Sequence, residues 1–98
     1  MAKEIVWTET AVRDRLRIYQ FWLSHNQSQI YSDKLEKLFN ESAKLIAEFP
    51  EIGSITDYKE IRVKTIGNHK LFYKHSENMI EIVRVWDTRQ NPADIDFG

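Results

Sequence analysis

The chain has 98 residues, no cysteine, and 14 Lys and Arg against 15 Asp and Glu residues. This length predicts one domain, and a hydrophobic content of 42% favours a folded core over disorder. The missing cysteines exclude disulfides, thiolate zinc sites and a thiol nucleophile, and the net charge of -1 argues against bulk attraction to nucleic acids or membranes. With no signal-peptide pattern and no apolar run that could span a bilayer, we expect a cytoplasmic protein.

The N-terminal segment predicts a short strand followed by a helix. Ile5 to Trp7 is an apolar run of strand-forming residues. Thr8 or Thr10 offers an N-cap for a helix over about residues 8–24. Its apolar positions repeat at helical spacing and are expected to face the core: Val12, Leu16, Tyr19 and Leu23, widened by Ile18 and Trp22. The other side of this helix is expected to carry Arg13, Asp14, Arg17 and Gln20.

A second helix is predicted between Ser28, a candidate N-cap, and Pro50, which disfavours helical geometry at the residue before it. Its expected apolar face consists of Tyr31, Leu35, Leu38, Ser42, Leu45 and Phe49, with Phe39 and Ile46 beside them. Because only a few polar residues separate the two helices, we expect an antiparallel helical hairpin.

The pattern changes to a period of two from Tyr58 onward, which predicts strands. Three strands, separated by turns at Gly67-Asn68 and at residues 76–78, are expected to form an antiparallel meander that ends at Trp86. The predicted fold class is α+β, with an antiparallel sheet of the N-terminal strand and the meander packed against the hairpin. An acidic tail, expected to be short and loosely held, follows Asn91-Pro92.

Charge is distributed unevenly along the chain. Residues 59–92 carry seven basic and four acidic side chains, a net charge of +3, whereas residues 1–58 and the tail are acidic. This basic region has two interpretations that the sequence leaves open. Its cations could bind phosphates, stabilise charge in phosphoryl transfer or meet an acidic protein. They could equally be the solvated face of an antiparallel sheet.

Strand periodicity places Arg62 and Lys64 on one face of their strand, and Lys70, Phe72 and Lys74 on one face of the next.

Several single residues also have two interpretations. Tyr73 is either a phenol acid/base or a buried tyrosine with its hydroxyl at the sheet edge. His69 and His75 are expected at the surface, with His69 the better candidate for proton transfer. The three tryptophans are expected in packing between helices and sheet. No nucleotide-binding motif and no metal-ligand spacing occurs, so neither a metal nor a cofactor is expected.

Four segments together resemble toxins of the RelE/ParE family: Ile61-Arg62, Leu71-Phe72-Tyr73, Ile80 to Pro92, and Phe49-Pro50-Glu51-Ile52-Gly53 after the helical hairpin. The resemblance covers nearly the whole chain and implies the same α+β fold. It also implies the toxin of a type II toxin–antitoxin pair, neutralised by a cognate antitoxin in a possible hetero-oligomer. RelE-like members cleave mRNA on the ribosome through attack of the substrate 2′-hydroxyl, without a metal, whereas ParE-like members inhibit DNA gyrase as protein ligands.

The resemblance also implies site residues. If the chain is an mRNA interferase, the matching catalytic positions are Arg62, Lys64, Lys70 and Arg89, with Tyr73 as a further candidate. A surface for target or antitoxin is expected to include Lys74, Arg84 and Trp86.

Three departures from the RNA-cleaving members favour gyrase inhibition. The tail carries Phe97 and no tyrosine or histidine, Asp87 stands where many relatives have histidine or a basic residue, and the chain is mildly acidic. The ribosome-dependent mRNA endonuclease is the alternative, and an inactive member that still binds antitoxin is the third possibility.

Overall fold

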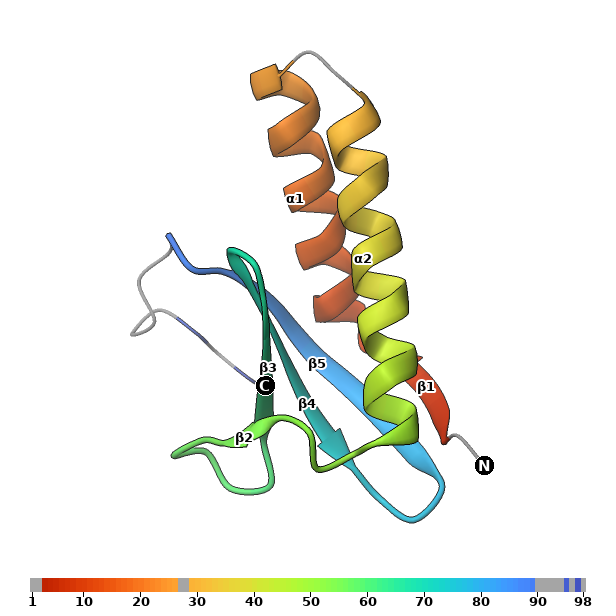
Figure 1. Ribbon diagram of the computed structural model, residues 1–98. Coiled ribbons are helices and arrows are strands. Elements are labelled where there is room, and N and C mark those ends of the chain that lie inside the picture. The colour runs from red at the N-terminus through yellow and green to blue at the C-terminus, as the bar shows by residue number, and fades with distance from the viewer. Residues whose placement is uncertain (1–2, 27–28, 90–94, 96, 98) are drawn as a thin grey trace.

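A computed structural model describes residues 3–26, 29–89, 95 and 97. The elements follow in the order β1 (Glu4–Trp7), α1 (Glu9–Asn26), α2 (Gln29–Glu48), β2 (Ser54–Ile55), β3 (Arg62–Ile66), β4 (His69–His75) and β5 (Met79–Asp87). The two helices form the expected antiparallel hairpin, which stands against one face of a single sheet and extends beyond its end (Figure 1). The predicted α+β fold class is confirmed.

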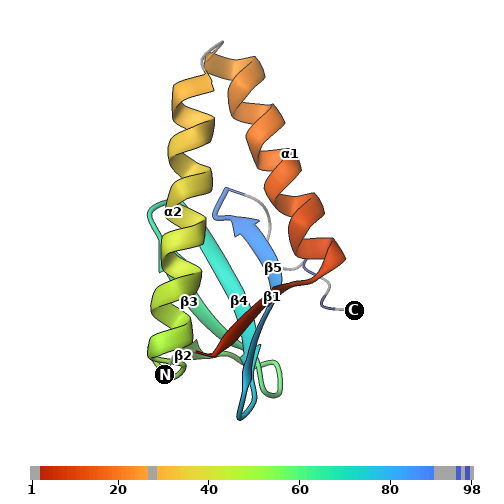
Figure 2. The same cartoon turned by 90° about the vertical axis from the view of Figure 1, so that its right-hand side faces the viewer.

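The sheet has the strand order β1-β5-β4-β3-β2. Strands β3, β4 and β5 form the predicted antiparallel meander, and Gly67 takes a φ of 57° in the turn between β3 and β4. Strand β1 pairs in parallel with β5, so the sheet is mixed rather than antiparallel throughout. Strand β2 was not predicted, because a two-residue strand carries no alternation pattern. Figure 2 shows β1 running beside β5 from the lower end of α2 to the lower end of α1.

The main core lies between the hairpin and the sheet. Its largest fully buried side chains include Phe39 and Ile46 from α2 and Leu71, Tyr73 and Ile80 from the sheet. Thr8 is the N-cap of α1, because its Oγ1 accepts a hydrogen bond from the Ala11 amide at 3.1 Å. The proposed cap at Ser28 lies outside the described residues.

The predicted apolar face of α1 is wrong in its orientation. Val12 and Leu16 are 51% and 55% exposed, and the buried side of the helix carries Ala11 and Asp14. Ile18, a predicted member of the apolar face, is buried with them as expected. Hydrophobicity alone predicts that the larger aliphatic residues face the core. The buried ion pair of Asp14 with Arg84 instead places the other side of the helix against the sheet. In α2, the buried residues Leu35, Phe39 and Ile46 agree with the prediction, whereas three of its other predicted members are more than one-third exposed: Leu38, Leu45 and Phe49.

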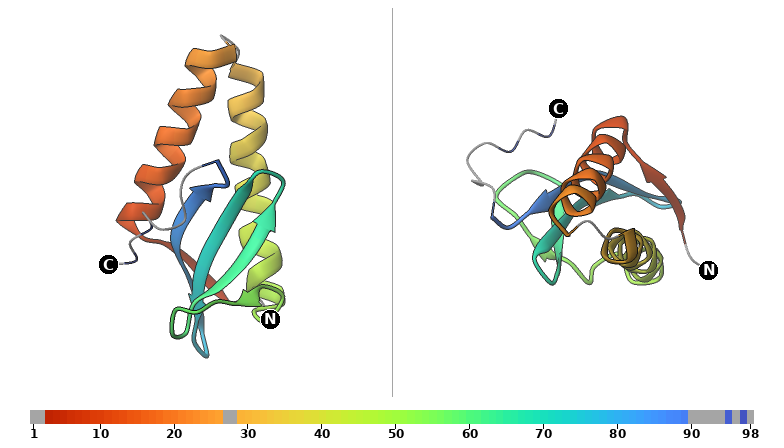
Figure 3. Two further views of the ribbon diagram at one scale, coloured as in Figure 1. Left: turned by 90° about the vertical axis from the view of Figure 1, so that its left-hand side faces the viewer. Right: turned by 90° about the horizontal axis from the view of Figure 1, so that it is seen from above.

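A second, smaller core lies on the face of the sheet away from the helices, which we call the open face. It consists of the buried side chains of Ile61, Phe72, Val83 and Trp86, with the partly buried Val63, Ile95 and Phe97 packed against them. Figure 3 (left) shows this face toward the viewer. Within the described residues, neither helix is long and apolar enough to cross a membrane.

Candidate functional site

Strand register divides the basic residues of the sheet between its two faces. Arg62 lies opposite Tyr73 and Lys64 opposite Leu71, which places both on the face that carries the hairpin. Lys70 lies opposite Trp86, on the open face. The region of net charge +3 is therefore not one patch, which corrects the idea of a single basic sheet surface.

Arg62 and Tyr73 fasten the loop that follows α2. The Arg62 guanidinium donates hydrogen bonds to the carbonyl oxygens of Gly53 at 2.8 Å and Glu51 at 3.4 Å. The Tyr73 hydroxyl donates to the carbonyl of Pro50 at 2.7 Å and accepts from the Gly53 amide at 2.9 Å. Tyr73 is fully buried, and this burial raises the pKa of its phenol. Tyr73 is therefore a buried tyrosine, but on the central strand β4, and its hydroxyl binds the backbone of the loop before β2.

Gly53 is needed at this place because of its small size. A Cβ atom there would lie 2.6 Å from the Tyr73 hydroxyl oxygen and 2.9 Å from the carbonyl oxygen of Val63. Both distances are too short for a real contact, so the loop can approach the sheet only with glycine at this position.

Arg84 forms a buried ion pair with Asp14 of α1. Its Nε and Nη2 atoms donate to the two carboxylate oxygens of Asp14 at 2.8 and 3.0 Å, and the Val85 amide donates to the same carboxylate at 3.0 Å. The pairing of β1 with β5 stops at Ile82, so α1 covers the edge of β5 beyond that point. Sequence reasoning missed this pair, because no local pattern links residues 14 and 84.

A cluster of polar and aromatic side chains lies at the end of β5. Arg89 donates to both carboxylate oxygens of Asp87, with Nε to Oδ1 at 3.0 Å, and these hydrogen bonds lower the pKa of Asp87. The Arg89 guanidinium also lies over the rings of Phe21 and Trp22, at 5.0 and 4.8 Å from their centroids. A hollow of about 340 Å³ borders this cluster. The charge of Arg89 is therefore compensated within the fold.

His69 belongs to the same cluster and is only 1% exposed, so its predicted surface position is wrong, whereas His75 is exposed as expected. The Nε2 atom of His69 lies 3.8 Å from the Asp87 carboxylate, and the His69 ring contacts the Phe39 ring edge to face. Burial lowers the pKa of His69. His69 is buried because Phe39 of α2 packs against it on β4, and this contact between distant residues could not be predicted from local sequence.

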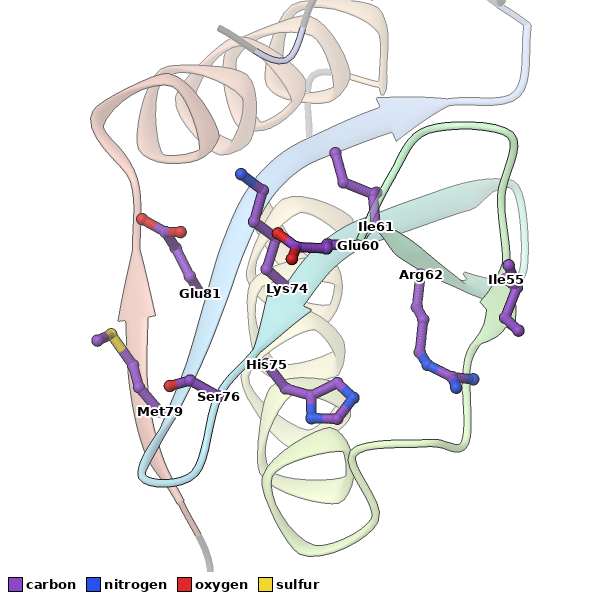
Figure 4. A pocket seen from close by; sticks show the side chains of 9 residues that line it. All are labelled: Ile55, Glu60, Ile61, Arg62, Lys74, His75, Ser76, Met79 and Glu81. Carbon is purple, nitrogen blue, oxygen red and sulfur yellow. The ribbon is translucent and has the colours of Figure 1, made fainter.

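A hollow lies at the end of the sheet near the turn between β4 and β5, and side chains from both faces of the sheet line it. Figure 4 shows this hollow, which measures about 640 Å³ and contains side chains of both charge signs, with Arg62 and Lys74 among the cations and Glu60 and Glu81 among the anions. The remaining lining is Ile55, Ile61, His75, Ser76 and Met79. A mixed, partly apolar surface of this kind suits a protein partner better than a polyanion.

Within the described ranges of the chain, no three His, Asp or Glu side chains converge as metal ligands. Lys64, Lys70 and Lys74 remain partly exposed on the sheet, without an ion pair to any described carboxylate. Trp86, a predicted partner-binding residue, is 6% exposed and lies in the small core of the open face.

Comparisons with known proteins agree with this architecture. The profile of the family described as "ParE toxin of type II toxin-antitoxin system, parDE" matches residues 5–92. No curated protein matches the chain in sequence. The chromosomal ParDE system of P. aeruginosa contains a chain that is 17% identical, with a TM-score of 0.77 over 88% of this chain and 96% of that one. The RelBE2 toxin–antitoxin complex of Mycobacterium tuberculosis contains one that is 15% identical, with a TM-score of 0.61 over 89% and 99%.

Proposed function

Since the chain belongs to the family of ParE toxins of type II toxin–antitoxin systems, we propose that it inhibits DNA gyrase by binding it, and that a cognate antitoxin holds it inactive. The proposal makes the toxin a protein ligand of its target. It assigns no bond-breaking step to the chain.

The main support is that the arginines of the sheet region are engaged within the fold. Arg62 is bound to loop carbonyls, Arg84 to Asp14, and Arg89 to Asp87. Stabilising the charge of a cleaved phosphodiester requires cations directed at the substrate. Side chains that already satisfy carboxylates and backbone groups serve the fold instead, which favours protein binding over RNA cleavage.

The proton-transfer groups support the same function. The Tyr73 hydroxyl makes one hydrogen bond as donor and one as acceptor inside the protein, and burial raises its pKa away from neutrality. Near the C-terminus, where RNA-cleaving members of the resembled family carry tyrosine or histidine, this chain has Phe97, whose side chain cannot exchange a proton. General acid–base catalysis needs a group with an accessible proton and a pKa near the working pH.

The test compares two assays with one toxin preparation. We expect the purified toxin to block DNA supercoiling by gyrase, to leave message intact in a translating extract, and to lose its effect when the antitoxin is added. Cleaved message with normal supercoiling would replace the proposal with the RelE-like endonuclease. If neither assay responds and expression without the antitoxin does not slow growth, the chain is an inactive member of the family.

A further inference from the structure

The outer side of α2 carries a stripe of exposed apolar side chains, which we call the α2 stripe. Its members Leu38, Leu45 and Phe49 are 37%, 39% and 56% exposed, and Ile52, which follows the helix, is 42% exposed. At about 3.6 residues per turn, intervals of seven and four residues place the three helical members on one side of α2. That side is about opposite Glu36, which forms an ion pair with α1. Figure 2 shows α2 along one edge of the molecule, with α1 on its other side.

Charged side chains beside the α2 stripe are distributed unevenly along the helix. Lys34 lies near the start of α2 and Glu48 at its end, with Glu41 midway between them. All three are exposed, and none forms an ion pair within the described part of the chain. Two such helices packed in parallel would place equal charges opposite each other. Packed antiparallel about a two-fold axis, they place Lys34 of each copy opposite Glu48 of the other.

The same antiparallel arrangement brings the apolar residues together. If the two-fold axis passes between residues 41 and 42, Leu38 and Leu45 both lie about 5 Å along the helix from it, on opposite sides. Leu38 of one copy therefore faces Leu45 of the other, and symmetry repeats the contact. Lys34 and Glu48 both lie about 10 Å from the axis, so one register satisfies the apolar and the charged positions.

A hollow at the end of α2 lies where the first turn of a second helix would reach. It measures about 650 Å³, and its lining includes Phe49, Pro50 and Ile52. Ile30, in the first turn of α2, is 80% exposed. This residue lies about 17 Å from the axis along its own helix, whereas the helix of the second copy ends about 10 Å from it, so Ile30 reaches past that end to the hollow. Removing such an exposed side chain from water favours association.

We propose that the α2 stripe is the interface of a homodimer, in which the α2 helices of two copies pack antiparallel about a two-fold axis between residues 41 and 42. The surface is self-complementary, as a two-fold interface requires, because each apolar or charged position meets a suitable one on the other copy. The open face of the sheet, on the side away from the hairpin, stays accessible to other partners. The inference goes beyond the proposed function and does not depend on gyrase being the target.

The test measures the mass of the full chain, without antitoxin, by analytical ultracentrifugation over a range of concentrations. Since one exposed stripe on each copy makes a small interface, we expect a dissociation constant of about 10–100 µM. Leu45→Glu should weaken the dimer about tenfold or more. The matched control is Leu16→Glu on α1, where the side chain is 55% exposed, and it should leave the dimer unchanged. A chain that stays monomeric up to about 500 µM would overturn the inference.

A charge exchange tests the antiparallel register even if Leu45→Glu fails to fold. Lys34→Glu should weaken the dimer about threefold or more at low salt, because it places a second carboxylate opposite Glu48 at both ends. Adding Glu48→Lys should restore the association. Glu41→Gln should strengthen it about twofold, because the two Glu41 carboxylates lie nearest the axis and repel each other. A double variant as weak as Lys34→Glu alone would overturn the arrangement.

Cross-linking then reports the orientation, since the chain has no cysteine of its own. A mixture of Lys34→Cys and Glu48→Cys proteins should be joined by a short bis-maleimide faster than either protein alone. Faster linkage within the Lys34→Cys protein alone would indicate parallel helices and overturn the inference. So would a monomeric toxin in which Leu45→Glu abolishes antitoxin binding, since the stripe would then serve that partner. Failure to inhibit gyrase would leave all of these results unaffected.

Discussion

Replacing Asp14 by alanine tests whether the buried ion pair fastens the hairpin to the sheet. Asp14 is 4% exposed, and its carboxylate accepts two hydrogen bonds from Arg84 and one from the Val85 amide. The substitution leaves the Arg84 charge buried without this partner and removes the acceptor of an amide at the strand edge. Breaking one side of such a pair costs about 3–5 kcal/mol.

That loss is large for a chain of this size. Small domains have a total free energy of unfolding of about 5–15 kcal/mol. At about 4–8 °C for each kcal/mol in a domain of this length, the melting temperature should fall by about 12 °C or more. Thermal unfolding followed by circular dichroism measures the change.

Two further variants make the result specific. Glu9→Ala removes an exposed ion pair with Arg13 on the same helix and should leave the melting temperature nearly unchanged. Asp14→Leu combined with Arg84→Met replaces the pair by apolar side chains and should recover much of the loss. If Asp14→Ala melted within about 2 °C of the unaltered protein, the pair would not stabilise the fold as argued.

Three more predictions concern the loop after α2 and the buried histidine. Tyr73→Phe should lower the free energy of unfolding by about 1–3 kcal/mol, because it leaves the Pro50 carbonyl and the Gly53 amide without their partner, and chemical denaturation measures this. Gly53→Ala should destabilise the protein through its clash with the Tyr73 hydroxyl, and Tyr73→Phe should relieve part of that cost; strictly additive losses would refute the contact. Because burial lowers the pKa of His69, the unfolded chain binds a proton more readily, so this contribution to stability is complete above about pH 6.5 and declines as the pH falls below it. His69→Phe should flatten that decline in urea unfolding curves; an unchanged slope would contradict it.

The order of elements could be predicted from the sequence because each has a local signal. Periodicity separated the helices from the meander, Pro50 marked the end of α2, and the turn at Gly67-Asn68 is where a residue with positive φ was needed. The cap at Thr8 was also visible in the sequence. These features depend on residues only a few positions apart, so no tertiary information was required.

The arrangement of the site could not be predicted in the same way. Arg84 and Asp14 meet only because α1 covers the edge of β5. Hydrophobicity alone predicts that the opposite side of α1, with Val12 and Leu16, faces the core. Periodicity shows which residues of one strand share a face. Which residues of neighbouring strands lie on the same face of the sheet depends on the register, and on the irregularity between Phe72 and Tyr73. The contact of Phe97 with the open face has no local signal either, so the small core on that face could not be predicted.

The most direct test of the central claim is a gyrase supercoiling assay with the purified toxin, titrated against a fixed amount of gyrase with and without its antitoxin. The account predicts that supercoiling stops as the toxin approaches the concentration of gyrase, and that the antitoxin restores it. Full supercoiling at a large excess of folded toxin would contradict the claim.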